Sequence, residues 1–197
     1  MMAFLEATPE AASLNQYWYS RRTIKALVAE IESGACGARI AFLSTPSVYF
    51  SLPESCAEVR ARSFVFDRDR QWASLPNFRD FDFNDGADAI EPSLRYTFDA
   101  TVVDPPFITR DAWAKYAAVV RRALAPGGRV LLTTVGENEA MLRTLLGPEI
   151  GASLRKTTFM PAMHRASLPY QYSLFVNYDL RPDSALREWN PEVVDGP

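Results

Sequence analysis

The tetrapeptide Asp104-Pro105-Pro106-Phe107 is the segment whose residue types and order are best suited to chemistry. Two successive prolines fix φ and remove two backbone donors, so the segment is stiff while its carbonyl groups remain acceptors. A carboxylate and a carbonyl held in this way can orient an NH₂ group, and the ring of Phe107 can cover a flat base or face a cationic amine. A plain strand-to-helix turn capped by Asp104 is the alternative. The apolar segment before it and the aromatic residue after it favour a functional site.

Two other carboxylates follow apolar segments of strand length. Asp67 ends residues 63–67, where a carboxylate can bind the two hydroxyls of a ribose, as it does in dinucleotide-binding folds. Asp69, two residues later, competes for this role. Asp82 comes near the end of residues 78–83 and is placed to accept a hydrogen bond from an adenine amine. The alternative for each is a carboxylate in a solvated loop.

The loop Ser44-Thr45-Pro46-Ser47 follows the first predicted strand. Nucleotide-binding folds usually place glycines at this point, because the backbone must approach the phosphate or nucleoside closely. Gly34 and Gly37 precede the strand and cannot serve. The small side chains of this loop can replace the glycines by offering hydroxyls and backbone N–H groups at the start of a helix.

Strand-length apolar segments alternate with segments of helical period along the chain. The predicted strands are 39–44, 63–67, 78–83, 98–103, 129–135, 154–160 and 172–179, and the predicted helices are 15–33, 111–124 and 137–146. Such alternation predicts a mostly parallel α/β sheet with helices on both faces. The last two strands should be antiparallel, because the loop 164–171 is too short for a parallel crossover.

Length and composition fit a single globular domain. The chain has 197 residues, of which 48% are hydrophobic and 23% charged. We expect residues 1–14 to be a loosely ordered lead-in and residues 15–197 to form the domain. The sequence shows neither a signal peptide nor an apolar run long enough to cross a membrane, so we expect a protein of the cytoplasm, and of the nucleus as a second location.

Charge and the few metal-binding residue types narrow the function further. The net charge of −3 disfavours binding through nucleic-acid phosphates and suits a basic protein partner. Cys36 and Cys56 are too few and too far apart for a zinc cluster, and His164 is the single histidine. We therefore predict no metal site and no Ser-His-Asp triad.

Six segments in this order carry a resemblance to a known family. They are Gln16-Tyr17-Trp18-Tyr19-Ser20, Ser44-Thr45-Pro46-Ser47-Val48-Tyr49, Phe66-Asp67-Arg68-Asp69, Phe81-Asp82-Phe83-Asn84, Asp104-Pro105-Pro106-Phe107 and Val176-Asn177-Tyr178-Asp179. From about residue 15 to 180, the chain resembles the eukaryotic lysine methyltransferases of translation elongation factor 1A. That group was first described as adenine-specific DNA methyltransferases, because its Asp-Pro-Pro-(Phe/Tyr) motif is similar to that of amino-methyltransferases.

The resemblance implies the Rossmann-like fold of class I methyltransferases, with seven strands in the order 3-2-1-4-5-7-6 and strand 7 antiparallel. It implies S-adenosylmethionine as methyl donor and a lysine of translation elongation factor 1A as acceptor. It also suggests that Trp18, Tyr19 and Ser20 fold over the cofactor. An adenine-specific nucleic-acid methyltransferase and an inactive binding module with the same fold remain the alternatives.

Lysine as acceptor sets a problem for Asp104. The nitrogen attacks in line with the sulfonium methyl and must first be neutral, yet its reference pKa lies about 3.4 units above pH 7, or roughly 4.6 kcal/mol. The sulfonium and partial burial lower that pKa, whereas an ionised Asp104 raises it. We therefore expect Asp104 and the Pro105 carbonyl to orient the amine while water or a tyrosine removes the proton. An adenine amine does not have this problem, because it is unprotonated at neutral pH.

Overall fold

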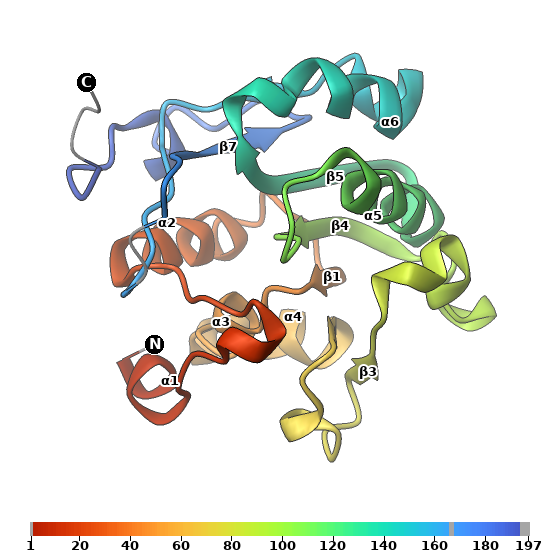
Figure 1. The fold of residues 1–197 in the computed structure, drawn as a ribbon, viewed down its shortest axis with the longest axis horizontal. Helices are drawn as coiled ribbons and strands as arrows, with labels where there is room; N and C mark the ends of the chain where they lie inside the picture. The colour runs from red at the N-terminus through yellow and green to blue at the C-terminus, as the bar shows by residue number, and fades with distance from the viewer. Residues whose placement is uncertain (1, 166–167, 194–197) are drawn as a thin grey trace.

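Seven strands lie side by side in the order β3-β2-β1-β4-β5-β7-β6 in a computed structural model that describes residues 2–165 and 168–193 (Figure 1). The strands are β1 (Ile40–Leu43), β2 (Phe64–Asp67), β3 (Phe78–Asp80), β4 (Phe98–Val103), β5 (Leu124–Val135), β6 (Arg155–Lys156) and β7 (Tyr172–Val176). The first five pair in parallel, whereas β7 is antiparallel to both β5 and β6. The predicted fold class, strand order and antiparallel strand are confirmed.

The register of the central strands brings the candidate residues to one edge. Leu43 at the end of β1 pairs with Phe66 on one side and Val103 on the other. The residues that follow these partners are Ser44, Asp67 and Asp104. Because parallel strands end at the same edge of a sheet, pairing alone places these three residues side by side at the carboxyl edge.

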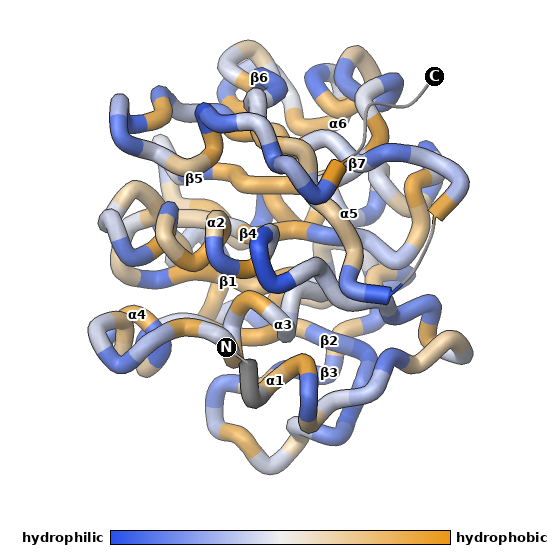
Figure 2. Tube along the Cα trace, turned by 90° about the vertical axis from the view of Figure 1, so that its left-hand side faces the viewer, coloured by the Kyte–Doolittle hydropathy of each residue, from blue (hydrophilic) through white to orange (hydrophobic). Residues whose placement is uncertain are grey.

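Helices cover both faces of the sheet. They are α1 (Met2–Ala7), α2 (Arg21–Glu32), α3 (Pro46–Tyr49), α4 (Ala57–Arg62), α5 (Arg110–Ala123) and α6 (Glu139–Gly151). Side chains alternate along β1, so Phe42 packs in the core with α2 while Leu43 packs in the core with α5. Figure 2 shows apolar residues along the strands between these layers. No described helix is long and apolar enough to cross a membrane.

Several element boundaries differ from those predicted. Helix α2 begins at Arg21 rather than near residue 15, because the Ser20 side chain accepts a hydrogen bond from the Thr23 N–H and caps the helix. Helix α6 continues past the predicted stop, with a kink at Gly147, where φ is +80°. Strand β6 keeps two residues of the predicted 154–160. Strand β5 begins at Leu124, five residues before the predicted start at residue 129.

Helix α1 lies in the segment for which we expected a loosely ordered lead-in. Phe4 and Leu5 are buried, and the Phe4 ring contacts Trp18 and Phe50 at centroid distances of 5.2 and 5.7 Å. These aromatic contacts fix α1 against the segment that precedes α2. The prediction missed the helix because six residues are too few to show a helical period.

Candidate active site

A cavity opens at the carboxyl edge of the sheet. Its lining comes from four parts of the chain: residues 14–18 before α2, the ends of β1 and β2 at Ser44, Asp67 and Arg68, residues 104–106 after β4, and four residues between 163 and 172. Ligands bind at this edge in open α/β sheets. Residues 104–106 of the predicted tetrapeptide therefore lie where a ligand of this fold is expected.

Asp104 lies half-buried in this cavity and is held from behind by hydroxyl groups. The Thr133 hydroxyl on β5 donates to Asp104 Oδ1 at 2.8 Å, and the Tyr19 hydroxyl lies 2.5 Å from Thr133 Oγ1. Burial raises the pKa of Asp104 to about 7, and hydrogen bonds from Thr133 and Tyr19 offset part of this rise. A pKa close to physiological pH suits a side chain that accepts a proton during the reaction.

Asp67 is the second carboxylate of the cavity. Its side chain is 6% exposed, and its Oδ1 accepts a hydrogen bond from the Asp69 N–H at 2.8 Å. Burial raises the pKa of Asp67 to about 7. Asp69, its competitor, accepts instead from the side chains of Gln16 and Gln71 and lies outside the lining. The structure therefore favours Asp67 over Asp69 as the ligand-facing residue.

Ser44 adopts the backbone conformation that a glycine would supply. Its φ is +55°, in the left-handed region, and its hydroxyl lies 2.6 Å from the Tyr116 hydroxyl. This conformation costs a non-glycine residue about 1–2 kcal/mol, so the surrounding packing must enforce it. The loop after β1 thus makes the close turn of a nucleotide-binding loop without a glycine.

The next three residues of that loop lie behind the cavity. Thr45 is buried and its hydroxyl donates to the Val102 carbonyl at 3.2 Å. Pro46 begins α3, and Ser47 is 3% exposed within that helix. None of the three contributes to the cavity lining, so they shape the loop from inside the protein.

The three residues before α2 divide between lining and support. Trp18 lines the cavity, and its indole N–H donates to the Thr8 carbonyl at 2.9 Å. Tyr19 is buried behind Asp104 through Thr133. Ser20 caps α2 and also hydrogen-bonds Glu192. One of the three residues expected to cover a cofactor therefore faces the cavity.

Asn15 joins the N-terminal segment to the tetrapeptide, a contact that the sequence did not predict. Its side-chain N–H group donates to the Pro106 carbonyl, so this carbonyl, expected to be free, is occupied. The left-handed φ of +51° at Asn15 is tolerated because asparagine adopts it more readily than most residues. Phe107 is 49% exposed and lies outside the lining, with its ring 6.2 Å from that of Phe83.

Asp82 lies beside the cavity rather than in it. Its carboxylate pairs with Arg68 at 3.3 Å and accepts from the Asn84 N–H at 2.9 Å. The backbone N–H of Asn84 lowers the pKa of Asp82, so it is ionised at neutral pH. Arg68 does line the cavity, and its ion pair with Asp82 connects Asp82 to the cavity.

Comparison with known proteins assigns the chain to a family. Residues 10–180 match the model of the family described as probable N6-adenine methyltransferase. The chain belongs to this family. EEF1A lysine methyltransferase 1 of Homo sapiens is 32% identical over 168 residues, which cover 84% of this chain and 74% of that protein. The protein of the same name from Danio rerio is 30% identical over 85% of this chain and 98% of its own length.

The fold of this methyltransferase has a solved counterpart. The branched-chain polyamine synthase from Thermus thermophilus superposes with a TM-score of 0.60 at 14% identity, over 95% of this chain and 65% of that one. Family and fold together make the chain a class I methyltransferase, with S-adenosylmethionine as methyl donor. The family, fold and donor implied by the sequence resemblance are confirmed.

Two tyrosines line the cavity of the methyltransferase although the sequence did not predict them there. Tyr170 and Tyr172 line the cavity with their rings 5.5 Å apart, and Tyr172 is buried on β7. Burial and the nearby Asp104 raise the pKa of Tyr172, which keeps its hydroxyl protonated. No spacing signal links residue 172 to residue 104, because only the antiparallel pairing of β7 with β5 brings them together.

The side-chain oxygen of Gln16 is a hydrogen-bond acceptor that the methyltransferase itself does not satisfy among its described residues. It lines the cavity, and its Oε1 atom is buried without a hydrogen-bond partner among the described residues. A buried acceptor without a partner costs about 1–3 kcal/mol, so a ligand donor at this point is favoured. This atom and the buried Asp67 carboxylate are acceptors suited to the hydroxyl and amino groups of a nucleoside donor.

Proposed function

We propose that this methyltransferase transfers a methyl group from S-adenosylmethionine to the side-chain amine of a lysine in translation elongation factor 1A. The observation that carries the proposal is the position of Asp104-Pro105-Pro106 in one cavity with Asp67, in a chain whose relatives are named EEF1A lysine methyltransferase 1. Because the proposed substrate is a translation factor, we place the enzyme in the cytoplasm.

The donor is assigned to the part of the cavity near β1 and β2. Asp67 accepts from the ribose hydroxyls, and the turned backbone at Ser44 allows close approach. Trp18 covers the bound nucleoside, and Gln16 Oε1 accepts from a donor group. When bound, S-adenosylmethionine supplies an electrophilic methyl group on a sulfonium. The left-handed Ser44 supports an active enzyme over an inactive module with the same fold.

In this assignment, the other residues predicted to bind the cofactor hold the ligand-facing residues in position. Tyr19 holds Asp104 through Thr133, and Ser20 fixes the start of α2. Thr45, Pro46 and Ser47 hold the loop that presents Ser44. Asp82 orients Arg68 and stands at the adenine end of the site.

In place of the water or tyrosine expected from the sequence, Asp104 is the base in this proposal, because its pKa is raised. An ordinary aspartate lies about 6.5 pKa units below lysine, which makes proton transfer from the ammonium uphill by about 9 kcal/mol. With the pKa of Asp104 at about 7, the difference falls to about 3.4 units, or about 5 kcal/mol. Burial of the lysine lowers its own pKa and so reduces the difference between the two pKa values further. The raised pKa thus eases the conflict that a strongly acidic Asp104 would create.

The neighbours of Asp104 set its geometry. Thr133 fixes Oδ1, which leaves Oδ2 to accept from the amine. The Pro105 carbonyl is the second acceptor for the amine, since the Pro106 carbonyl is bound to Asn15. Phe107 stands at the entrance, where its ring can face the cationic side chain.

Adenine is the second candidate acceptor, because the family description names N6-adenine methylation. An adenine amine needs two acceptors and no base, and Asp104 with the Pro105 carbonyl also supplies those. The net charge of −3 disfavours this reading, since nucleic-acid binding normally needs a basic surface.

The test supplies purified translation elongation factor 1A and total nucleic acid, separately, with the enzyme and methyl-labelled S-adenosylmethionine. The labelled products are hydrolysed and identified. Methyllysine in the factor, absent with Asp104→Ala, is expected. Label recovered as N6-methyladenine, or equal methyllysine with Asp104→Ala, would overturn the proposal.

A further inference from the structure

The mouth of the cavity carries three of the six large apolar side chains that are exposed in the described part of the chain. Leu14, Phe107 and Tyr170 are 39%, 49% and 38% exposed. Leu14 and Tyr170 line the cavity, and Phe107 directly follows a lining residue. Apolar surface gathered at one opening marks an interaction site, whereas scattered exposed residues do not.

Hydrogen bonds hold the loops of this surface in place. The contact from Asn15 to the Pro106 carbonyl joins the immediate neighbours of Leu14 and Phe107. Met163, which lines the cavity on the side of Tyr170, is tied to the N-terminal segment by a β-bridge with Tyr19. Residues held by such contacts lose less conformational entropy when a partner binds.

Arg68 in the lining and Lys115, beside the ring of Phe83 that contacts Phe107, each have an acidic partner. Arg68 pairs with Asp82 at 3.3 Å, and Lys115 pairs with Asp111 at 2.7 Å. These two pairs neutralise their cations, and the chain as a whole carries a net charge of −3, whereas a nucleic-acid partner would require a basic surface. An apolar surface beside paired charges suits a folded protein surface.

We propose that Leu14, Phe107 and Tyr170 form an apolar rim that docks the protein carrying the target lysine, and that the Asn15 contact holds this rim in shape. The inference rests on the proposed function, since the lysine must pass through the rim to reach Asp104. The partner surface presents its lysine among apolar side chains that cover the rim. Binding of the protein therefore depends on residues at the mouth of the cavity as well as on those that orient the reacting nitrogen.

The experiment compares rim variants with matched controls from elsewhere on the surface. Leu14→Ser and Tyr170→Ser are paired with Leu75→Ser and Tyr96→Ser, which remove exposed side chains of the same types that do not line the cavity. KM and kcat are measured with purified translation elongation factor 1A. Each rim variant is expected to raise KM roughly tenfold, as truncation of a well-packed interface residue does, while each control stays within about twofold.

Two further measurements separate docking from other effects. Asn15→Asp keeps the size of the side chain but removes the donor to Pro106, and a KM increase of about fivefold is expected from the loosened rim. The dissociation constant of S-adenosylhomocysteine is measured by calorimetry for every variant. A KM increase fully matched by lost cofactor affinity would overturn the inference.

The failures of the two proposals are distinguishable. If the wild-type enzyme methylates the factor and the rim variants keep its KM, the rim inference is wrong and the proposed function stands. If the wild-type enzyme leaves the factor unmethylated, the proposed function is wrong and the rim inference falls with it.

Discussion

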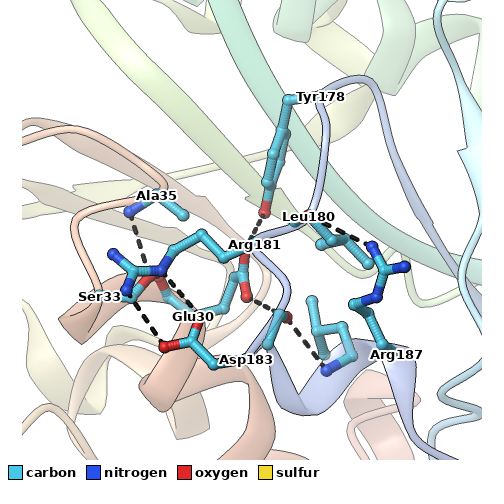
Figure 3. A network of polar contacts seen from close by, with 10 residues as sticks. Glu30, Ser33, Ala35, Tyr178, Leu180, Arg181, Asp183 and Arg187 are labelled. Atoms are coloured by element: carbon cyan, nitrogen blue, oxygen red, sulfur yellow. Dashed lines mark hydrogen bonds and ion pairs between the residues drawn. The ribbon is translucent and has the colours of Figure 1, made fainter.

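Two regions of this enzyme contain carboxylates in opposite settings, the buried Glu30 and the half-buried Asp104. Glu30 on α2 is 3% exposed, and its two oxygens accept from the Tyr178 hydroxyl at 3.2 Å and the Ser184 hydroxyl at 2.5 Å (Figure 3). Asp104 has one oxygen held by Thr133 and faces the cavity. Both are at least partly withdrawn from bulk water, but only Asp104 is open to a ligand.

The difference shows that access, rather than burial, separates a structural acid from a chemical one. Glu30 fixes the C-terminal segment to α2, because both hydroxyl donors come from residues after β7. Figure 3 shows Glu30 at the centre of these contacts. Asp104 retains an oxygen for a substrate, and burial raises its pKa because its hydrogen bonds offset only part of the desolvation.

Turnover should respond most strongly to Asp104. Asp104→Asn keeps an acceptor oxygen but cannot take a proton, so kcat should fall by at least about 100-fold. Steady-state methylation of translation elongation factor 1A measures this effect, and S-adenosylhomocysteine affinity should stay near the wild-type value. Glu30→Gln is the matched control and should retain turnover. Equal losses in both variants would show that the two carboxylates do not differ in role.

The free energy of unfolding should respond most strongly to substitution of Glu30. Glu30→Ala leaves the Tyr178 and Ser184 hydroxyls without their acceptor, so the free energy of unfolding should fall by about 2–4 kcal/mol. Urea denaturation followed by circular dichroism measures the change. Glu32→Ala, at an exposed position of the same helix, should stay within about 0.5 kcal/mol. A loss as small at Glu30 as at Glu32 would remove Glu30 from its structural role.

The pH dependence of stability should reveal the raised pKa of Asp104. Because the pKa of Asp104 is raised to about 7, the folded state holds a proton that the unfolded state has lost between about pH 4 and pH 7. Asp104 therefore costs stability increasingly as pH rises through that range. Asp104→Asn should stabilise the fold by about 1–2 kcal/mol near pH 8, and the gain should vanish near pH 4. Thermal melts that show no pH-dependent gain would contradict the raised pKa.

Thr133 should have the smallest effect, a displacement of the pH profile. Its hydrogen bond lowers the pKa of Asp104, so Thr133→Val should move the acid limb of the kcat/KM profile upward by about half a pH unit to one unit. Thr133→Ser keeps the hydroxyl and should restore the wild-type limb. A purely structural role would lower activity at every pH without moving the limb.

The sequence predicted those parts of the enzyme that local pattern determines. Strand β4 was predicted to the residue, because its apolar run ends at Asp104 and two prolines. Asp67 was placed correctly at the end of β2 by the same kind of signal. Parallel pairing then required both residues to share one edge of the sheet.

The remaining features depend on contacts between distant residues. The Asn15 contact with Pro106 spans 91 positions, and no local pattern encodes it. The left-handed backbone of Ser44 is imposed by its surroundings, since serine alone disfavours it. Tyr172 reaches the cavity only through the pairing of β7 with β5. These features result from tertiary contacts, which residue propensities and hydrophobic periodicity do not predict.

A crystal structure of the enzyme with S-adenosylhomocysteine tests the central claim most directly. We predict that the nucleoside occupies the cavity with its ribose hydroxyls on Asp67, and that its sulfur lies beside the open oxygen of Asp104. A nucleoside bound elsewhere, or one whose sulfur faces away from Asp104 and Pro105, would contradict the account.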